Sequence, residues 1–536
     1  MVSEAASGYV YGFPALRRHN GVKPLRTLIP FLFVLLPLAA MAQVPSPATE
    51  RLPVAAPVPL SGRSAQIGGV GTARTTNPGG LPTSANTSIN TVQVQGAYSG
   101  SVPQGTATAE PLALSLDNAI RRGLQYNLAT TGYDNALRVA EAQKMMARSA
   151  LLPTVSMHLL GDEQQSSLAA FGFTPSLIPG IPSIVGPFHF FDLRAGVAMN
   201  VVDFPSLHNN RAAAENVKAT RLAAKDARDL IVLAVSGTYL QAIAAASRVD
   251  ASKAQVNSAD AVYQQAVDRN KAGVNARIDV LRSQVELQVQ QQRLRSLQAD
   301  LEKQKLNLGR LIGLPPGQEF TMTDSAPYAP LEGLDLPQAL DRAYKNRSDL
   351  RAAQAQVAAA EQAQRAAMAE RLPSAGVLAD YGAIGVDPSN SHGTVTLTGV
   401  LHMPIFEGGR IRADIDQARA AVDQRKAELA DLRGRIDYEV RSAFVDLQAA
   451  VDQVRVSRSS VDLASETLTQ ARDRFAAGVA DTIETVQAEE SVAAANEDFI
   501  SSLYSYNLAK VSLARAMGVA EESMKELFPA TPQAHQ

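Results

Sequence analysis

Histidine and cysteine, two side chains often used in acid–base, nucleophilic and metal chemistry, are scarce in this sequence. The 536 residues contain no cysteine and only seven histidines. None of the spaced motifs that cradle phosphate, expose a nucleophilic serine or bind zinc is present. We therefore expect no enzymatic activity, no cofactor and no metal site. The histidines are far apart along the chain: His19, His158, His189, His208, His392, His402 and His535.

A repeated stretch of unreactive residues is more informative. RNKAGVNARIDVLRSQ begins at Arg269, and RFAAGVADTIETVQAE begins at Arg474, which lies 205 residues further along the chain. Both stretches carry Ala-Gly-Val, and both place an acidic residue six positions after the glycine, namely Asp279 and Glu484. A glycine that follows a helix suits the left-handed conformation in which many helices end. The pattern predicts two equivalent turns between helices.

The rest of the chain is duplicated in the same way. LSLDNAIRRG near residue 116 resembles LDLPQALDRA near residue 336, Leu-Pro at 152–153 recurs at 372–373, and LGRLIGL resembles LARAMGV. We therefore predict two copies of one unit, at 111–312 and 336–520. A linker at 313–335 joins them, and a tail follows at 521–536.

Each copy shows the same order of periodicities. A helical stretch (116–152, then 336–372) ends at Leu-Pro, because proline cannot continue a helix. Polar–apolar alternation then predicts strands at about 154–163 and 191–203, and again at about 374–384 and 393–404. Such alternation is typical of either a soluble half-buried strand or a membrane barrel strand, and taken alone it favours the soluble strand.

A long polar helix follows the strands in each copy and ends near Asn270 or Arg474. At ~1.5 Å per residue it spans ~100 Å. After the Ala-Gly-Val turn of the first copy, apolar residues recur every seven positions from Val280 to Leu308, which predicts a coiled-coil seam. The lengths place the strands at one end of a rod and the helical turns at the other. Four strands per chain are too few to close a barrel, so membrane-embedded strands would require three chains and twelve strands.

The N-terminal region has two parts. Basic residues precede the apolar run TLIPFLFVLLPLAA and Ala40-Met41-Ala42, which predicts a signal peptide at 1–42. A membrane anchor is the alternative, and the short run with Pro30 and Pro37 argues against it. Residues 43–110 are rich in Pro, Gly, Ser and Thr, so we expect a disordered arm there.

Together these features resemble the TolC-type outer-membrane efflux family. The signal peptide, the tandem duplication, Leu-Pro before the strands, the paired Ala-Gly-Val turns and PIFEGGR (404–410) carry the resemblance over about 112–520. It implies a mainly α fold with a transmembrane β part, in a homotrimer whose twelve-stranded barrel continues into an α-helical periplasmic tunnel. The implied function is a passive exit duct for efflux or type I secretion. A periplasmic adaptor would couple this duct to an inner-membrane transporter. The implied location is the outer membrane, without a lipid anchor because the chain has no cysteine.

The resemblance also assigns roles to residues. The Ala-Gly-Val turns would form the periplasmic tip that docks the adaptor, and acidic side chains just behind them would ring the aperture. Asp279 and Glu484 match two such positions, whereas neutral Gln487 weakens the ring at a third. Phe475 and Ala480 stand where some members carry a tyrosine and a basic residue that latch the closed tip, and these two side chains cannot supply the groups of that latch. The docking residues are Ala272, Gly273, Val274, Ala477, Gly478 and Val479.

The strand–helix junctions are also assigned. Pro153, Pro373, Pro404, Gly408 and Gly409 mark them, and the glycines would let the chain turn from strand into helix. The first copy lacks the Gly-Gly pair and would use Pro205 and Asn209-Asn210 instead.

Two other functions fit parts of the pattern. A secreted or periplasmic coiled-coil spacer without a pore would explain the helices. A periplasmic adaptor would explain one helical hairpin, but such proteins contain one hairpin with small β domains rather than a duplicated unit.

Overall fold

The computed structural model describes residues 69–76, 88–174, 176–274, 276–324, 328, 334–477, 479 and 482–527. The chain divides into two compact units, Met1–Ser64 and Ala65–Gln536, and every helix and strand of the described residues belongs to the second unit. The predicted signal peptide at 1–42 lies outside the described residues.

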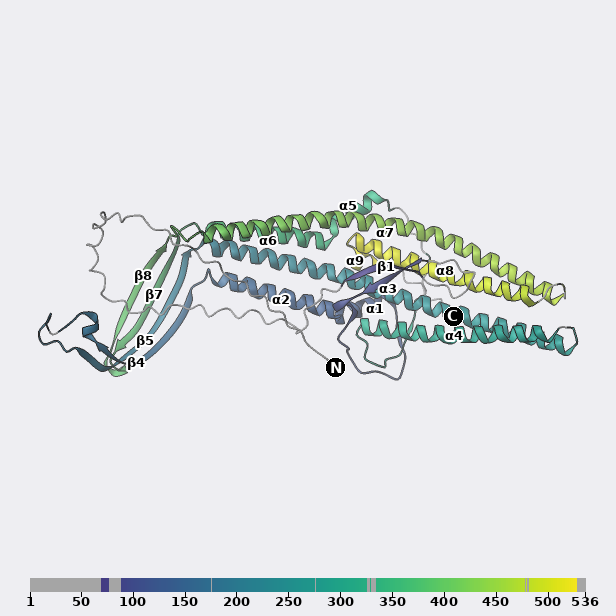
Figure 1. Ribbon diagram of the computed structural model, residues 1–536, viewed down its shortest axis with the longest axis horizontal. Coiled ribbons are helices and arrows are strands. Elements are labelled where there is room, and N and C mark those ends of the chain that lie inside the picture. The colour runs from purple at the N-terminus through teal and green to yellow at the C-terminus, as the bar shows by residue number, and fades with distance from the viewer. Residues whose placement is uncertain are drawn as a thin grey trace, which may run out of the picture. The chain divides into compact units, whose positions relative to one another are not determined.

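Four long helices are the main elements of this second unit (Figure 1). Helices α3 (Phe204–Lys271) and α7 (Arg410–Ala476) contain 68 and 67 residues, so each spans ~100 Å. Each is followed by a turn and by a helix that runs back beside it, α4 (Arg277–Leu311) or α8 (Thr482–Ala516). The two helical turns lie together at the end of the unit furthest from the sheet (Figure 1).

The helical stretch before the strands is broken in both copies, whereas we predicted a single helix in each. The observed pairs are α1 (Leu116–Tyr126) with α2 (Leu128–Ser149), and α5 (Leu336–Asn346) with α6 (Ser348–Ala369). The breaks fall at Asn127 and Arg347, which are equivalent positions of the two copies. Both residues are buried and have non-helical backbone, and each donates a side-chain hydrogen bond to the last turn of a neighbouring helix. Asn127 Nδ2 reaches the Leu311 carbonyl at 3.3 Å, and Arg347 Nη1 reaches the Ala516 carbonyl at 3.5 Å.

The sheet contains four antiparallel strands in the order β4 (Thr154–Ser167), β5 (Ile184–Val202), β7 (Ser374–Gly385) and β8 (Ser391–His402). All four predicted strands are present, and three are longer than the alternation indicated. The central pair joins β5 of the first copy to β7 of the second. The connection between β4 and β5 is long and contains the short helix η2 (Leu168–Phe171), while β7 and β8 are joined through η3 (Pro388–Asn390).

The strand–helix junctions differ between the copies. Gly408 and Gly409 both have positive φ, 60° and 92°, and they lead directly into α7 as predicted. In the first copy, Asp203 caps α3 and accepts a hydrogen bond from the Ser206 amide at 2.9 Å. Pro205 lies in the first turn of that helix, where its missing N–H costs no hydrogen bond. The predicted use of Asn209-Asn210 is wrong, because both residues lie inside α3.

Two hydrophobic cores hold the helices together, one built mainly from the first copy with α8 residues added and one built from the second copy. The first surrounds the central part of α3, where every residue from Ile231 to Leu240 is buried. The second surrounds Ile436 and Val440 of α7. The apolar window of α3 is long enough to cross a membrane, but 78% of it is buried inside the unit, so it is a core segment.

The predicted disorder of 43–110 is wrong for its described residues. Strands β1 (Val70–Thr76) and β2 (Ser88–Val94) form an antiparallel hairpin, and η1 (Gly96–Ser99) follows. This segment is too poor in apolar residues to build a core, but Val92, Val94 and Tyr98 pack onto the core around α3. Further on, β3 (Leu112–Leu114) pairs in parallel with β6 (Phe320–Met322) of the predicted linker, and α9 (Ala520–Leu527) occupies part of the predicted tail.

Candidate functional site

One face of the four-stranded sheet exposes a continuous apolar surface. Val155 and Met157 of β4 are 76% and 73% exposed, and Val395, Leu397 and Leu401 of β8 are 78%, 76% and 75% exposed. Soluble proteins rarely leave so many large apolar side chains together in water. The four strands contain 12 to 19 residues each. A strand of this length is long enough to cross a bilayer.

The opposite face of the same strands is polar. Arg194 of β5 forms ion pairs with Asp192 on its own strand and with Asp380 of β7. His158 lies opposite Arg194 in the register of β4 and β5, and Thr396 lies opposite Asp380. An apolar face and a charged face on one sheet match lipid on one side and water on the other.

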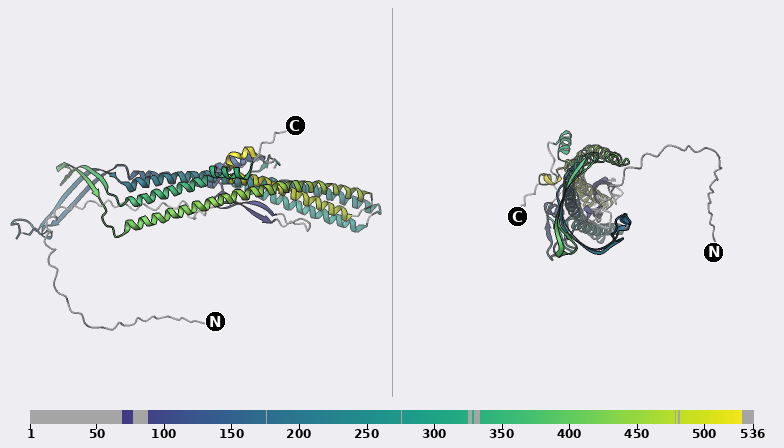
Figure 2. Two further views of the ribbon diagram at one scale, coloured as in Figure 1. Left: turned by 90° about the horizontal axis from the view of Figure 1, so that it is seen from above. Right: turned by 90° about the vertical axis from the view of Figure 1, so that its left-hand side faces the viewer.

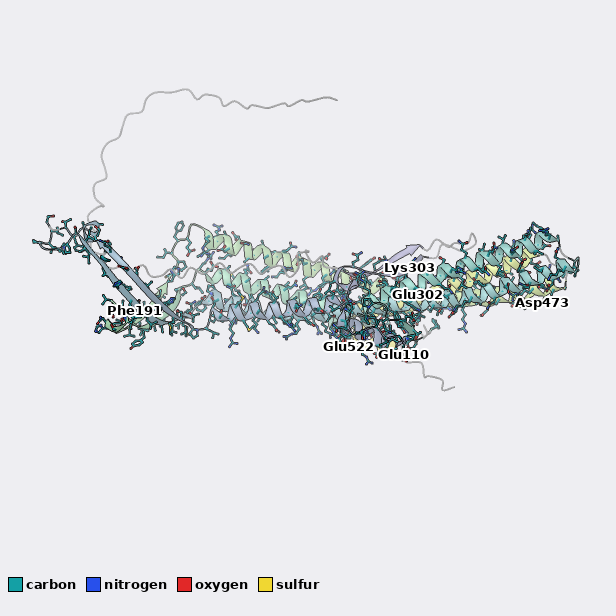
Figure 3. The ribbon with its side chains drawn as sticks, turned by 90° about the horizontal axis from the view of Figure 1, so that it is seen from below. Glu110, Phe191, Glu302, Lys303, Asp473 and Glu522 are labelled. Atoms are coloured by element: carbon teal, nitrogen blue, oxygen red, sulfur yellow. The ribbon has the colours of Figure 1, made fainter. Side chains whose placement is uncertain are left out.

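Three phenylalanines lie in the first half of β5. Phe188, Phe190 and Phe191 all belong to β5. Because successive residues of a strand point to opposite faces, Phe190 shares the face of Asp192 while Phe191 shares the apolar face. Figure 3 shows Phe191 at the sheet end and Asp473 at the far end of the helices.

The described parts of the two turns at that far end share one backbone hydrogen bond. In the first, Gly273 has a φ of 75°, its amide donates to the Asn270 carbonyl, and the Val274 amide donates to the Arg269 carbonyl at 2.9 Å. This is a Schellman ending, as the sequence pattern predicted. In the second, the Val479 amide donates to the Arg474 carbonyl at 3.1 Å. Gly478 and Ala480 lie outside the described residues.

Each turn presents a bare apolar side chain. Val274 and Val479 are both 70% exposed, and no atom lies within 4 Å of the position that a Cβ on Gly273 would occupy. Ala272 and Ala477 are the C-cap residues of α3 and α7. The predicted docking residues that the structure describes therefore lie at one end of the unit, in an open setting.

The acidic residues behind the turns have arginine partners of their own. Glu484 pairs with Arg474 at 3.0 Å, and Asp279 pairs with Arg282 at 3.8 Å. The two acids are equivalent in the repeat, but their partners are not. Gln487 is exposed on α8.

Arg269 links the two copies at the tip, a contact that the sequence analysis missed. Its guanidinium lies 4.6 Å from the centre of the Phe475 ring and donates to the Ala476 carbonyl at 2.8 Å. Phe475 is 2% exposed. The repeat did mark Arg269, because it is the equivalent of Arg474 in the first copy. Its partners could not be predicted from the repeat, since both belong to the other copy.

Further polar contacts join α3 to the second copy along its length. Ser258 of α3 donates to Glu489 of α8 at 2.5 Å, and it accepts a hydrogen bond from Arg472 of α7. Nearer the middle, Arg248 of α3 pairs with Glu497 of α8 at 2.7 Å. These contacts fasten the first copy to the second from the tip inward.

Buried charges occupy the middle of the unit. Asp226 of α3 pairs with Arg515 of α8 at 2.8 Å, and burial raises the pKa of the Asp226 carboxyl to about 6 even though Arg515 opposes the shift. Burial alone would also raise the pKa of Asp349, but its hydrogen bonds and attraction to Arg347 outweigh this and hold the pKa below its usual value. Arg347 also pairs with Glu439 of α7 at 2.5 Å. Burial therefore sets the direction of the pKa shift at Asp226, whereas the contacts with Arg347 set it at Asp349.

The comparison with protein families assigns this architecture. The family model described as outer membrane efflux protein matches residues 133–314 and 339–519, one match in each copy and together more than half of the chain. The chain belongs to the outer membrane efflux protein family. It is therefore an outer-membrane transport protein, and its family is one of channels rather than of enzymes.

Individual relatives of this family cover most of the chain. Nodulation protein T of Rhizobium leguminosarum bv. trifolii is 23% identical over 403 residues, which span 72% of this chain and 81% of that protein. The pyoverdine export outer membrane protein OpmQ of Pseudomonas aeruginosa is 23% identical over 431 residues, 77% of this chain and 87% of that one.

Solved efflux-family structures share the fold. The Campylobacter jejuni CmeC outer membrane channel superposes with a TM-score of 0.67 at 17% identity, over 84% of this chain and 98% of that chain. The open state of the Neisseria gonorrhoeae MtrE outer membrane channel superposes with a TM-score of 0.65 at 16% identity, over 78% of this chain and 94% of that chain.

Proposed function

We propose that three copies of this chain form a passive exit duct through the outer membrane, in a tripartite export system with a periplasmic adaptor and an inner-membrane transporter. The observation that carries the proposal is the two-faced sheet at one end of a helical layer ~100 Å long. Strands β4 and β8 each have one unpaired edge in a single chain. An open edge is not tolerated in lipid, and three copies would pair every edge in a twelve-stranded barrel.

Planar bilayers and membrane fractions test the duct. We expect heat-resistant trimers in the outer-membrane fraction and a steady conductance from the purified protein. A soluble monomer without conductance would instead support a coiled-coil spacer. We expect no catalytic turnover from either form.

We further propose that the helical turns dock the adaptor. Val274 and Val479 give the tip two exposed apolar contact points, and the small residues beside them permit close approach of a partner helix. Relatives carry names as different as pyoverdine export and alkaline protease secretion, so we assign the choice of cargo to the transporter rather than to the duct.

We assign the aperture to Asp279 and Glu484, with Gln487 as a neutral position. Replacing Glu484 with Gln removes one negative charge per chain and should lower the cation preference of single channels, measured as the reversal potential in a salt gradient. Glu302→Gln on α4 is the matched control, because Glu302 pairs with Lys305 on its own helix. Equal selectivity of the wild type and the Glu484 variant would remove Glu484 from the aperture.

A further inference from the structure

The hairpin of β1 and β2 has one apolar face and one exposed face. In its register Val70 lies opposite Val94 and Gly71 lies opposite Gln93. Val70, Val92 and Val94 pack against the core around α3, whereas Gly71 and Gln93 are exposed. The hairpin is therefore seated by alternate valines and presents small, uncharged side chains outward.

The seat of the hairpin spans the two copies. Gly237 of α3 lies directly beneath Val92, and a Cβ at this position would overlap the Val92 side chain. Leu508 of α8 approaches the same point at 3.4 Å. Val92 occupies the space that a side chain at position 237 would need, so the contact requires a glycine there.

The hairpin lies on the opposite side of α3 from α1. Val235 and Ile231 of α3 contact Gly123 of α1, at 2.6 Å and 3.5 Å from its Cβ position. Residues 235 and 237 are about 200° apart around the helix, because each residue advances by about 100°. The hairpin and α1 therefore contact different sides of α3.

The hairpin face is the concave one. Figure 2 shows the helical layer and the sheet curving in the same sense, with β1 and β2 on the inside of the curve and α9 on the outside. When a curved layer closes into a tube, its concave face becomes the bore.

We propose that the β1–β2 hairpin is an internal constriction of the duct, half-way along the helical layer and separate from the aperture at the tip. The proposal rests on the proposed function, since it needs the closed trimer. Three hairpins then project into the bore, and their exposed Gly71 and Gln93 line the passage. Cargo passes this point after leaving the tip and before it reaches the barrel.

The absence of cysteine from the chain makes a direct test possible. Gln93→Cys places a single thiol on the exposed face of the hairpin, and Glu522→Cys places one on α9, on the convex side. A bulky charged methanethiosulfonate reagent should lower the single-channel conductance of the Gln93 variant several-fold and leave that of the Glu522 variant unchanged. Complete labelling at position 93 with unchanged conductance would overturn the proposal.

A second pair of variants tests the same point without a reagent. Gly237→Leu should push the hairpin off its seat and raise the conductance, while Gly434→Leu in α7, where nothing lies within 4 Å of the Cβ position, should not. Lower or unchanged conductance in the Gly237 variant, with trimers intact, counts against a constriction. Failure of the proposed duct looks different, because the unmodified protein would then give neither trimers nor conductance.

Discussion

Arg269 makes two contacts across the tip, with the ring of Phe475 and with the Ala476 carbonyl. Both partners belong to the other copy, so a single side chain holds the ends of α3 and α7 together. A cation over an aromatic ring contributes about 0.5–1 kcal/mol at an exposed site. This arginine–phenylalanine pair lies at the end of α7, beside the turn that follows it.

Replacing Arg269 with Ala should therefore loosen the tip. We expect more frequent or longer openings in single-channel recordings, because both contacts between the copies are lost. Lys271→Ala is the control, since Lys271 pairs with Asp268 in its own helix at 3.2 Å. Identical open probabilities in the Arg269 variant and the wild type would show that the pair does not restrain the tip.

Asp226 gives stability a pH dependence. Its pKa in the folded protein is about 6, above its ordinary value of 3.8. Between about pH 4 and pH 6 the folded chain holds a proton that the unfolded chain has released, so stability falls as the pH rises through this window. The pKa of Asp229 is also raised by burial and adds to the slope, whereas the lowered pKa of Asp349 acts only at lower pH.

The Asp226→Asn variant should lose part of this slope. We expect its melting temperature to change less between pH 4 and pH 6 than that of the wild type, with the Asp229 contribution remaining. An unaltered slope in the variant would mean that Asp226 is ionised throughout this range.

At the scale of elements, strand β8 has one face suited to lipid and one face suited to water. Leu397 faces the apolar side and Thr396 the polar side, one residue apart. A lysine on the lipid face of a membrane strand costs about 2–4 kcal/mol near the bilayer centre, whereas one on the water-facing side costs little.

Leu397→Lys should accordingly reduce the amount of trimer recovered from the outer membrane, while Thr396→Lys should leave assembly intact and alter conductance. Quantitative immunoblots of membrane fractions, with and without heating, measure assembly, and single-channel recordings measure conductance. Normal assembly of the Leu397 variant together with failure of the Thr396 variant would reverse the assigned faces.

The elements also show what a sequence can disclose. Alternation located all four strands, and the Ala-Gly-Val pattern located both helix ends, because these signals are local. The breaks at Asn127 and Arg347 were missed because their cause is distant: each side chain bonds to a carbonyl at the end of another helix. The hairpin of β1 and β2 was missed for a similar reason, since it packs on a core supplied by α3. The partner of Arg269 likewise depends on how the two copies lie side by side.

At the scale of the whole molecule, polar pairs between α3 and the second copy run from the middle of the unit to the tip. Arg248 and Glu497 are the half-buried central pair, 19% and 25% exposed. Removing one partner of a half-buried pair leaves the other poorly solvated, and the cost is about 1 kcal/mol or more.

Arg248→Ala should lower the temperature at which trimers dissociate, and the effect should shrink in high salt because screening already weakens the pair. Lys253→Ala serves as the control, since Lys253 pairs with Asp250 within α3 at 3.0 Å. Equal losses in both variants would assign the effect to the helix itself rather than to the contact between copies.

The pairing of β5 with β7 has a consequence for how such a molecule arises. A half-length ancestor with one copy would offer two strands and one helical turn, and six separate subunits would be needed for the same closure. Joining two copies in one gene halves the number of subunits that must assemble. It also allows the two copies to differ in sequence. The two equivalent arginines then have different partners: Arg269 packs over the ring of Phe475, whereas Arg474 pairs with Glu484. A threefold ring of such duplicated chains would present two kinds of tip where a sixfold ring of single copies would present one.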